Sequence, residues 1–561
     1  MDRRRFLKLS SAVSTGLVIS TQMYGCSSKH FVLPENQVEF NHGVASGDPT
    51  QSAIVLWTRA TPANSQDTQV HLVWQLAKDS SFTQIVREGS AQASKVTDYT
   101  VKVDVRDLEE NQAYYYRFIT QKNSSVTGTT RTLPKSTVEQ VKLGIFSCSN
   151  YPAGFFNPYM AASQDSEIDV VLHLGDYIYE YSSTGYATED AQRLGRTFDK
   201  DNQGELFTLD DYRKRYATYR TDKGLQALHQ AKPFIVVWDD HEVANDTYNE
   251  GAENHNEGEG DFFARRAAAV QAYYEWLPIR PPMGDTQPHI YRTFEFGDLI
   301  ALHMLDTRVI GRDKQLEYGD YRNTETGEFD TDGFVRDMSD ASRSLLGSEQ
   351  RDWLINQVKK SPSHWQVLGQ QVLMGKMHYP AEIFAGQNRE KIPQTIEQLV
   401  GIKQKQLKGE TLSDVETKRL TTTMPYNLDA WDGYPVEREM IYGSAKQANK
   451  QLVVFAGDTH NGWCSDLVDN NGEIRGIEFA TAGVSSPGIE SYLKLSDDTA
   501  KNLSQALPLL IKDLTYCNLH QRGYLTVTFT REEAQAHWYY VDTIKSEDFV
   551  IADEHTVTFQ G

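Results

Sequence analysis

The chain has 561 residues, of which 39% are hydrophobic and 24% charged, and its formal net charge at pH 7 is −21. This composition is typical of a folded protein, and the length favours one large domain with at least one smaller one. The acidic excess excludes nucleic acid as a bulk electrostatic partner, because such binding depends on clustered lysine and arginine. A phosphate substrate is not excluded, since bound cations can make a pocket locally positive.

The first residues have the features of an export signal. The basic run Arg3-Arg4-Arg5-Phe6-Leu7-Lys8 precedes a weakly apolar stretch, Leu9 to Met23, that is too short to span a bilayer. Paired arginines followed by Phe-Leu-Lys resemble a twin-arginine signal, which directs folded proteins out of the bacterial cytoplasm. We therefore expect residues 1–25 to be this signal, with the twin-arginine machinery as a partner. The expected location is the periplasm or the outer cell surface.

The four cysteines outside the export signal predict little cross-linking. Met23-Tyr24-Gly25-Cys26 resembles a lipoprotein processing box, so either Cys26 becomes a lipidated residue that attaches the protein to a membrane, or cleavage occurs nearby without lipid. Four cysteines are too few for a disulfide framework in a chain of this length. Cys464 with Cys517 is the obvious pair, and unpaired buried cysteines are the alternative.

Residues 36–134 are expected to form a small all-β domain. Short β-rich runs alternate with turn residues, at Ala53–Trp57, Val70–Gln75, Tyr99–Val105 and Tyr114–Ile119. This pattern predicts a β-sandwich of the immunoglobulin or fibronectin kind. The segment Leu108 to Arg117 resembles a tyrosine corner, in which a tyrosine ties a loop to the backbone, and an ordinary aromatic strand is the alternative.

From residue 140 to 561 the pattern changes to buried strands separated by helical stretches. Helices are expected at Leu209–Tyr219, Asp261–Trp276 and Ser348–Lys360, with Ser348 as the N-cap of the last. Repeats of strand and helix with polar residues at strand ends predict a layered α/β/α sandwich. Its site is expected in the crevice beyond the carboxyl ends of the strands. The polar segment Gly401–Thr423 is expected to be a surface insertion.

Residue types that bind metals follow four of the apolar strands. Cys148 follows Leu143–Ser147, Asp176 and Tyr179 follow Ile168–Leu174, Asp239 to Glu242 follow Phe234–Trp238, and Asp458 and His460 follow Leu452–Ala456. A pair of ions needs a bridging carboxylate and flanking ligands from several strands. The sequence therefore predicts a metalloenzyme whose site is built from strand ends.

The ligand types indicate two different ions. Asp176 is the candidate bridge, and a phenolate from Tyr179 favours an ion of high charge such as Fe(III). Cys148 adds a soft thiolate that Mg or Ca would not use, and His460 completes this set. The second ion is expected to bind oxygen from Asp176, Asp458 and either Asp240 or Asn245, which suits Ca or Mg.

Six motifs in order along the chain resemble the alkaline phosphatase D (PhoD) family of phosphodiesterases and monoesterases. They are Phe146-Ser147-Cys148-Ser149, His173 to Glu180, Trp238 to Asn245, Asp306-Thr307-Arg308, Ala430 to Pro435, and Gly457-Asp458-Thr459-His460. The pattern is also similar to purple acid phosphatases, with Cys148 where those enzymes have aspartate and Asp458 where they have a first histidine. The resemblance implies a metallophosphoesterase-like catalytic domain with a site for Fe(III) and Ca, with one Ca or more.

The resemblance implies an exported phosphoesterase that hydrolyses phosphate monoesters, diesters or both. The expected nucleophile is an oxide or hydroxide held by the two ions. His241 is then expected near the leaving group or a phosphoryl oxygen, with a role outside the ligand set as the alternative. Arg308 either binds a nonbridging oxygen or forms a salt bridge beside Asp306. Trp431, Tyr434 and Trp463 are candidates to line the pocket, and core packing is the alternative for each.

Two other functions remain open at this point. One is a phospholipase D-like or nuclease specificity on the same metal site. The other is a noncatalytic calcium-binding surface lipoprotein in which the β-sandwich performs the recognition. Cys148 together with Tyr179 favours an enzyme, because a structural calcium site has no use for a thiolate and a phenolate.

Overall fold

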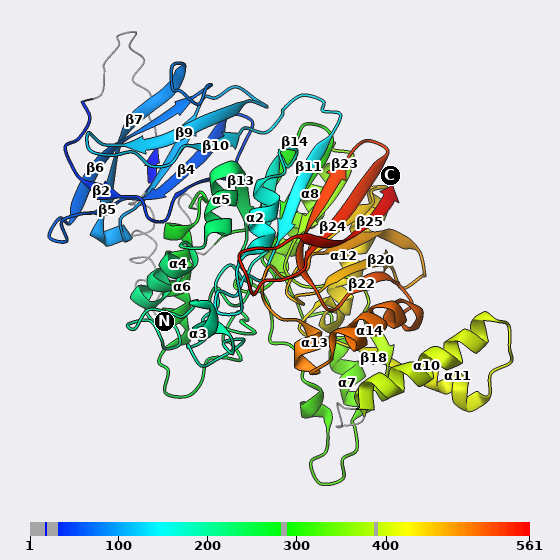
Figure 1. The fold of residues 1–561 in the computed structure, drawn as a ribbon. Helices are drawn as coiled ribbons and strands as arrows, with labels where there is room; N and C mark the ends of the chain where they lie inside the picture. The colour runs from blue at the N-terminus through cyan, green and yellow to red at the C-terminus, as the bar shows by residue number, and fades with distance from the viewer. Residues whose placement is uncertain (1–16, 20–31, 282–288, 386–390) are drawn as a thin grey trace.

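A computed structural model describes residues 17–19, 32–281, 289–385 and 391–561. The chain forms an N-terminal β-sandwich beside a larger α/β body (Figure 1). The predicted export signal and Cys26 lie outside the described residues, except that Leu17–Ile19 form the short strand β1. None of the described helices has both the length and the apolar character that crossing a bilayer requires.

The N-terminal part has the two facing sheets expected of a sandwich. One sheet contains β6 (Gln69–Ala77), β7 (Ile85–Ser94), β9 (Ala113–Ile119) and β10 (Gly128–Arg131), and it faces β3 (Val44–Gly47), β4 (Ala53–Arg59) and β8 (Thr100–Arg106). Alternate residues of both sheets, such as Leu56, Trp74 and Phe118, form one buried core. The short strands β2 (Val38–Glu39) and β5 (Thr61–Pro62) pair at its margin. The predicted all-β domain is confirmed.

The sandwich is joined to the larger α/β body through a shared sheet. Strand β3 pairs in parallel with β13 (Pro233–Val236), and the sheet runs on through β12 (Val170–His173), β11 (Val141–Phe146), β23 (Arg522–Phe529), β24 (Glu533–Val541) and β25 (Ile551–Gln560). Arg280 reinforces the junction, because its Nε donates to Asp104 Oδ1 at 2.9 Å and its backbone N–H donates to Asp48. This sheet has ten strands, including β1 at one edge.

A second, seven-stranded sheet packs face to face against the first. Its order is β14 (Arg292–Phe296), β15 (Ile300–Met304), β16 (Trp365–Gly369), β19 (Leu452–Ala456), β21 (Ile474–Ala480), β20 (Gly462–Val468) and β22 (Leu514–Asn518). Val453 and Phe455 belong to the core between the sheets, whereas the alternate residue Val454 belongs to the core under the helices. The Phe529 ring of the first sheet lies 5.9 Å from that of Trp365. The predicted layered α/β sandwich is thus confirmed, with two sheets in its middle.

Helices cover the outer faces of both sheets. The ten-stranded sheet carries α2 (Asn157–Ser163), α4 (Leu209–Tyr219), α5 (Lys223–Ala231) and α6 (Phe262–Trp276), and the seven-stranded sheet carries α8 (Ser348–Lys360), α12 (Pro435–Gln447) and α14 (Asp497–Leu510). The three predicted helices are present, and Asp261 caps α6 by accepting from the Ala264 N–H. The prediction of Ser348 as an N-cap is wrong. Ser348 is the first helical residue, and Gly347, with a φ of 75°, precedes it.

The remaining elements are short or project from the body. They are α3 (Ala191–Leu194), α7 (Thr331–Met338), α9 (Glu382–Ala385), α10 (Ile392–Leu407), α11 (Asp414–Thr421), α13 (Ile489–Tyr492), the strand pair β17 (His378–Pro380) and β18 (Thr423–Pro425), and 3₁₀ turns at Lys95–Thr97, Tyr318–Tyr321 and Trp431–Gly433. The predicted insertion, Gly401–Thr423, forms most of a helical hairpin that extends from the rest of the molecule (Figure 1).

The pairing of Cys464 with Cys517 is wrong. Both thiols are free and buried, as is that of Cys148. In the β20–β22 ladder Cys464 lies opposite Tyr516, and Cys517 lies opposite Trp463. This offset of one residue directs the two cysteine side chains to opposite faces of the sheet, because strand side chains alternate.

The tyrosine-corner interpretation leads to a stability prediction. The Tyr114 hydroxyl accepts a hydrogen bond from the Glu109 N–H at 3.1 Å. Tyr114→Phe leaves that N–H without its partner and should lower the free energy of unfolding by about 1 kcal/mol. Denaturant unfolding of the protein would measure this loss. Tyr115→Phe, on the opposite face of the same strand, should cause no comparable loss, and equal effects of the two changes would contradict the prediction.

Candidate metal centre

The carboxyl ends of strands from both sheets meet at one buried cluster. Cys148 follows β11, Asp176 follows β12, Asp239 and Asp240 follow β13, and Asp458 and His460 follow β19. Strands β11, β12 and β13 are mutually parallel, as are β15, β16 and β19, so their carboxyl ends share an edge. The structure thus brings together residues separated by more than 300 positions in the sequence.

Four of these residues have backbone conformations that are unfavourable for their type. Cys148, Asp176, Asp458 and His460 have φ values of 62°, 54°, 63° and 63°. Left-handed backbone at a residue other than glycine costs about 1–3 kcal/mol and persists only where the surroundings enforce it. Such strain is concentrated at functional sites. The backbone conformations that place these four residues together therefore lower the stability of the fold.

The first group of ligands contains the residues predicted for the iron-type ion. Ligand atoms of Cys148, Asp176 and His460 all lie within 4.8 Å of one another. The Tyr179 hydroxyl is 3.0 Å from Asp176 Oδ2 and 3.2 Å from His460 Nε2. Asp176 Oδ1 is buried and has no hydrogen-bond partner among the described residues. A buried, unpartnered carboxylate oxygen in this position fits a metal ligand.

His460 is oriented as a ligand by its second ring nitrogen. Nδ1 lies 2.6 Å from the Pro487 carbonyl oxygen, which can only accept, so Nδ1 carries the proton. Nε2 is then left with its lone pair near Asp176 and Tyr179. Burial lowers the His460 pKa to about 4, so the imidazole is neutral near physiological pH. A neutral imidazole with a free nitrogen is the form that binds a metal.

A second group of ligands adjoins the first. Carboxylates of Asp239, Asp240 and Asp458 lie within 4.8 Å of one another, and Asp176 and Asp240 form a further group with His241. Asp176 therefore belongs to groups on both sides, which is the geometry that a bridging carboxylate requires. The sequence left Asp240 and Asn245 as alternative ligands of the second ion. Asp240 belongs to two of these ligand groups. Asn245 lines the same pocket, and its side-chain amide donates to Glu253 at 3.1 Å.

The centre holds more buried acidic groups than its cationic residues can offset. Burial raises the pKa of Asp176 and of Asp458 well above their usual range, and it raises that of Asp239 to about 7. Burial also raises the pKa of the Cys148 thiol and of the Tyr179 phenol, with Asp176 adding to both effects. A bound cation would reverse these shifts by stabilising the ionised forms. The donor set therefore fits metal ions electrostatically as well as geometrically.

Arg308 is a buried counter-ion among these carboxylates. Its Nε donates to Asp239 at 2.5 Å, and its terminal nitrogens donate to Asp458 and to Asp429, each at 2.7 Å. Asp306 does not form a side-chain salt bridge with it. Instead, Asp306 Oδ1 accepts from the backbone N–H of Arg308 at 2.9 Å. The predicted salt bridge at Arg308 exists, but its partners are these three aspartates and Asp240, whose Oδ2 lies 3.8 Å from Arg308 Nη2.

His241 lies beside the candidate ligands, and its ring is oriented by a contact with Glu180. Nδ1 of His241 is 2.7 Å from Glu180 Oε2, and the His241 ring packs on that of Tyr179 at 4.2 Å. Glu180 is fully buried and also accepts from Asn254 and from the Asn245 N–H. Although burial lowers it, the pKa of His241 is raised well above its usual value by Asp240, Glu180 and Asp176. His241 is thus an oriented group at the site, and the neighbouring carboxylates favour its protonated form.

A pocket of about 230 Å³ opens onto this cluster. Its walls include Asp246, Asp429 and Trp463. The other two aromatic candidates belong to the core, since Trp431 donates to Gln370 and Tyr434 donates to the Asp313 carbonyl. Sequence reasoning missed Asp246 and Asp429, and it placed Asp239 at a strand end without assigning it to an ion. Asp239 was visible as the neighbour of Asp240 at a strand end, whereas Asp429 follows no strand and carried no such signal.

Fold and site together define a layered α/β enzyme with a buried centre of metal-binding residue types at its strand ends. The family model described as "PhoD-like phosphatase" matches residues 143–538, and that described as "PhoD-like phosphatase, N-terminal domain" matches residues 25–134. The chain belongs to the PhoD-like phosphatase family and is a phosphoesterase.

Two relatives agree with this assignment. Alkaline phosphatase D from Bacillus subtilis (strain 168) is 34% identical over 506 residues, which are 87% of this chain and 76% of that protein. A solved structure described as "Structure of PhoD" superposes with a TM-score of 0.73 at 30% identity, covering 95% of this chain and 92% of the other. The family predicted from the six motifs is confirmed.

The role of Arg308 as a counter-ion is testable without turnover. Arg308→Met should destabilise the chelator-treated protein by about 3–5 kcal/mol, because it leaves buried carboxylates uncompensated. Added calcium should then raise the melting temperature of this variant more than that of the unaltered protein, since a cation can replace the lost charge. Thermal unfolding with and without calcium measures both effects. Arg336→Met, at an exposed pair with Asp337, is the control. Equal calcium responses of all three proteins would contradict this role.

Proposed function

We propose that this protein is an exported, metal-dependent phosphoesterase that uses Fe(III) and Ca. The observation that carries the proposal is the convergence of a thiol, a phenol, an imidazole and a carboxylate, from Cys148, Tyr179, His460 and Asp176. The Asp176 Oδ2 atom lies 3.0 Å from the Tyr179 hydroxyl, and its Oδ1 atom is buried without a hydrogen-bond partner among the described residues. A thiolate and a phenolate together favour a trivalent iron over Mg or Ca.

The proposed ligands divide between two ions. Cys148, Tyr179 and His460 with Asp176 would hold iron. Asp176, Asp240 and Asp458 would supply oxygen to calcium, with Asp239 and Asn245 as further oxygen donors at the same side. More than one calcium is compatible with this number of carboxylates. When bound, such ions lower the pKa of a coordinated water and offset the charge that develops on a phosphoryl group.

The protein's own residues would act by orientation and charge. Glu180 engages Nδ1 of His241, so that Nε2 is the nitrogen available to a substrate. We propose that protonated His241 acts through Nε2. It either donates its Nε2 proton to the leaving oxygen or donates a hydrogen bond from Nε2 to a phosphoryl oxygen. Arg308 already pairs with four aspartates, and we propose that it anchors them rather than binding phosphate.

The substrate class is a phosphate monoester, a phosphate diester or both. A phospholipase D-like or nuclease specificity on the same centre is the second candidate, and the net charge of −21 argues against a long nucleic acid. A noncatalytic calcium-binding lipoprotein is disfavoured, because the chain belongs to a phosphatase family.

We further propose that the protein acts in the periplasm or at the outer cell surface. Support comes from Arg3 to Lys8 at the start of the chain, which resemble a twin-arginine signal, and from Cys26 as a residue for lipid attachment. A route that exports folded proteins suits a centre whose ligands converge only in the folded state.

The iron assignment is tested by Cys148→Ala. The purified protein should contain iron and calcium and absorb visible light, since phenolate bound to Fe(III) is coloured. Cys148→Ala should lower the iron content and the hydrolysis of a paired monoester and diester, because it removes one ligand. Cys464→Ala, at a buried free cysteine outside the centre, is the matched control. Full iron content and full activity in Cys148→Ala would overturn the assignment of iron, and a colourless protein holding calcium alone would do the same.

The role of His241 is tested by the choice of leaving group. His241→Gln should lower kcat by about 10²–10⁴-fold for alkyl phosphate esters, whose leaving oxygen needs a proton. The loss should be much smaller for a nitrophenyl ester, whose leaving group is stable as an anion. Metal content measured in parallel should be unchanged. Equal losses on both esters would argue instead for a contact to a phosphoryl oxygen.

A further inference from the structure

Arg522 contacts the candidate metal centre through the His460 backbone and lines a different cavity from the 230 Å³ pocket. It is the first residue of β23, which runs antiparallel to β11. The amino end of β23 therefore lies at the edge of the sheet where β11 ends and Cys148 begins the site. The residue is only 7% exposed. None of the six sequence motifs includes Arg522.

The Arg522 guanidinium joins two segments of the site. One terminal nitrogen donates to the His460 carbonyl oxygen at 2.8 Å and to the Ser486 carbonyl oxygen at 2.7 Å. The other donates to Glu490 Oε1 at 2.6 Å. Glu490 Oε1 also accepts from the Gly488 N–H at 3.0 Å. A single buried cation thus fixes the loop from Ser486 to Glu490 against the segment that carries His460.

That loop holds three of the four iron-type ligands. The Ser486 hydroxyl lies 2.6 Å from the Tyr179 hydroxyl and 2.9 Å from the Cys148 carbonyl oxygen. The next residue, Pro487, supplies the carbonyl oxygen that accepts from His460 Nδ1. A shift of this loop would therefore turn the phenol of Tyr179 and release the ring of His460 together.

We propose that Arg522 is a positioning residue of the metal centre. By holding the carbonyl groups of His460 and Ser486, it fixes the loop that orients Tyr179 and His460 toward Asp176. His460 has a left-handed backbone, and such a conformation persists only where neighbouring contacts enforce it. The bond to the His460 carbonyl is one of those contacts. This inference rests on the proposed function, because it assumes that Tyr179 and His460 bind a metal.

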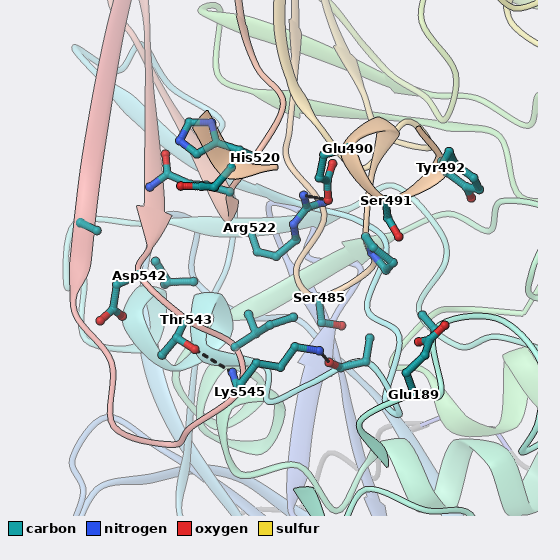
Figure 2. A pocket seen from close by; sticks show the side chains of 18 of the residues that line it. Glu189, Ser485, Glu490, Ser491, Tyr492, His520, Arg522, Asp542, Thr543 and Lys545 are labelled. Atoms are coloured by element: carbon teal, nitrogen blue, oxygen red, sulfur yellow. Dashed lines mark hydrogen bonds and ion pairs between the residues drawn. The ribbon is translucent and has the colours of Figure 1, made fainter. Parts of the chain in front are cut away.

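A cavity beside Arg522 and Glu490 is open to small molecules. Arg522, Glu490 and Ser485 line a cavity of about 680 Å³, and Figure 2 shows the Arg522 guanidinium directed at Glu490 within it. Tyr186 lines the same cavity, with its hydroxyl 3.1 Å from His460 Nδ1. This cavity is separate from the 230 Å³ pocket on the ligand side, and Tyr492 lines both. A free guanidinium ion could therefore reach the position of a truncated Arg522 side chain.

The test measures metal retention instead of turnover. Arg522→Ala should lose metal to a chelator at a concentration about 10- to 100-fold lower than the unaltered protein does, as for other residues that orient metal ligands. Elemental analysis and the visible absorption band are the readouts. Guanidinium, added well below concentrations that unfold the protein, should restore part of the retention. Arg522→Lys keeps the charge but not the forked donors, and it should show an intermediate loss.

Arg438→Ala is the matched control. Arg438 is also buried, pairs with Asp432 at 2.7 Å and donates to the Met374 carbonyl oxygen at 3.2 Å, but none of its contacts is to a proposed ligand. Its loss should lower the melting temperature and leave metal retention unchanged.

Unchanged metal retention in both Arg522 variants would overturn the positioning role, and so would an equal loss of retention in Arg438→Ala. These results would leave the proposed function intact, because the unaltered protein would still hold its metals. If the unaltered protein bound no metal, the proposed function and this inference would fail together.

Discussion

The rest of the structure depends on the concentration of buried acidic groups at one edge of two sheets. Carboxylates of Asp176, Asp239 and Asp240 lie close together away from water, with the partly buried Asp458 beside them, and each disfavours ionisation of the others. Buried charge of one sign is tolerated only with compensation nearby. Arg308 supplies one positive charge from within the chain. The remaining excess of acidic groups favours the binding of cations, and it is the electrostatic basis of the metal dependence that we propose.

Close packing of the two sheets makes this concentration geometrically possible. Gln371, after β16, donates to the Trp238 carbonyl of the ten-stranded sheet at 2.7 Å and to the Leu305 carbonyl of the seven-stranded sheet at 2.9 Å. Its side-chain oxygen accepts from the Thr307 hydroxyl at 2.6 Å. One amide thus joins the ends of strands from both sheets directly beneath the site. The strained residues Cys148, Asp176, Asp458 and His460 then contribute the clustered ligand atoms at these strand ends.

Much of this arrangement was predictable because it is encoded locally. Apolar strands followed by Cys148, Asp176 or Asp458 indicate metal ligands at the carboxyl ends of these strands. The helical periodicity of the sequence predicted the bounds of α4 and α8. The support around the ligands was not predictable. Glu180, Ser486 and Arg522 act through contacts between distant segments, and no spacing along the chain reveals such contacts. For the same reason, the offset of Cys464 and Cys517 to opposite faces appeared only in the strand register.

The sequence by itself determined the order of strands and helices, the family and the residue types of the centre. These depend on local patterns, which the chain carries whether or not it is folded. Only the tertiary structure decided that Asp176 belongs to both ligand groups, that Arg308 pairs with aspartates other than Asp306, and that Asp239 joins the cluster. The physical reason is that burial and distance set the charge balance of a site. Both arise only when the two sheets pack together.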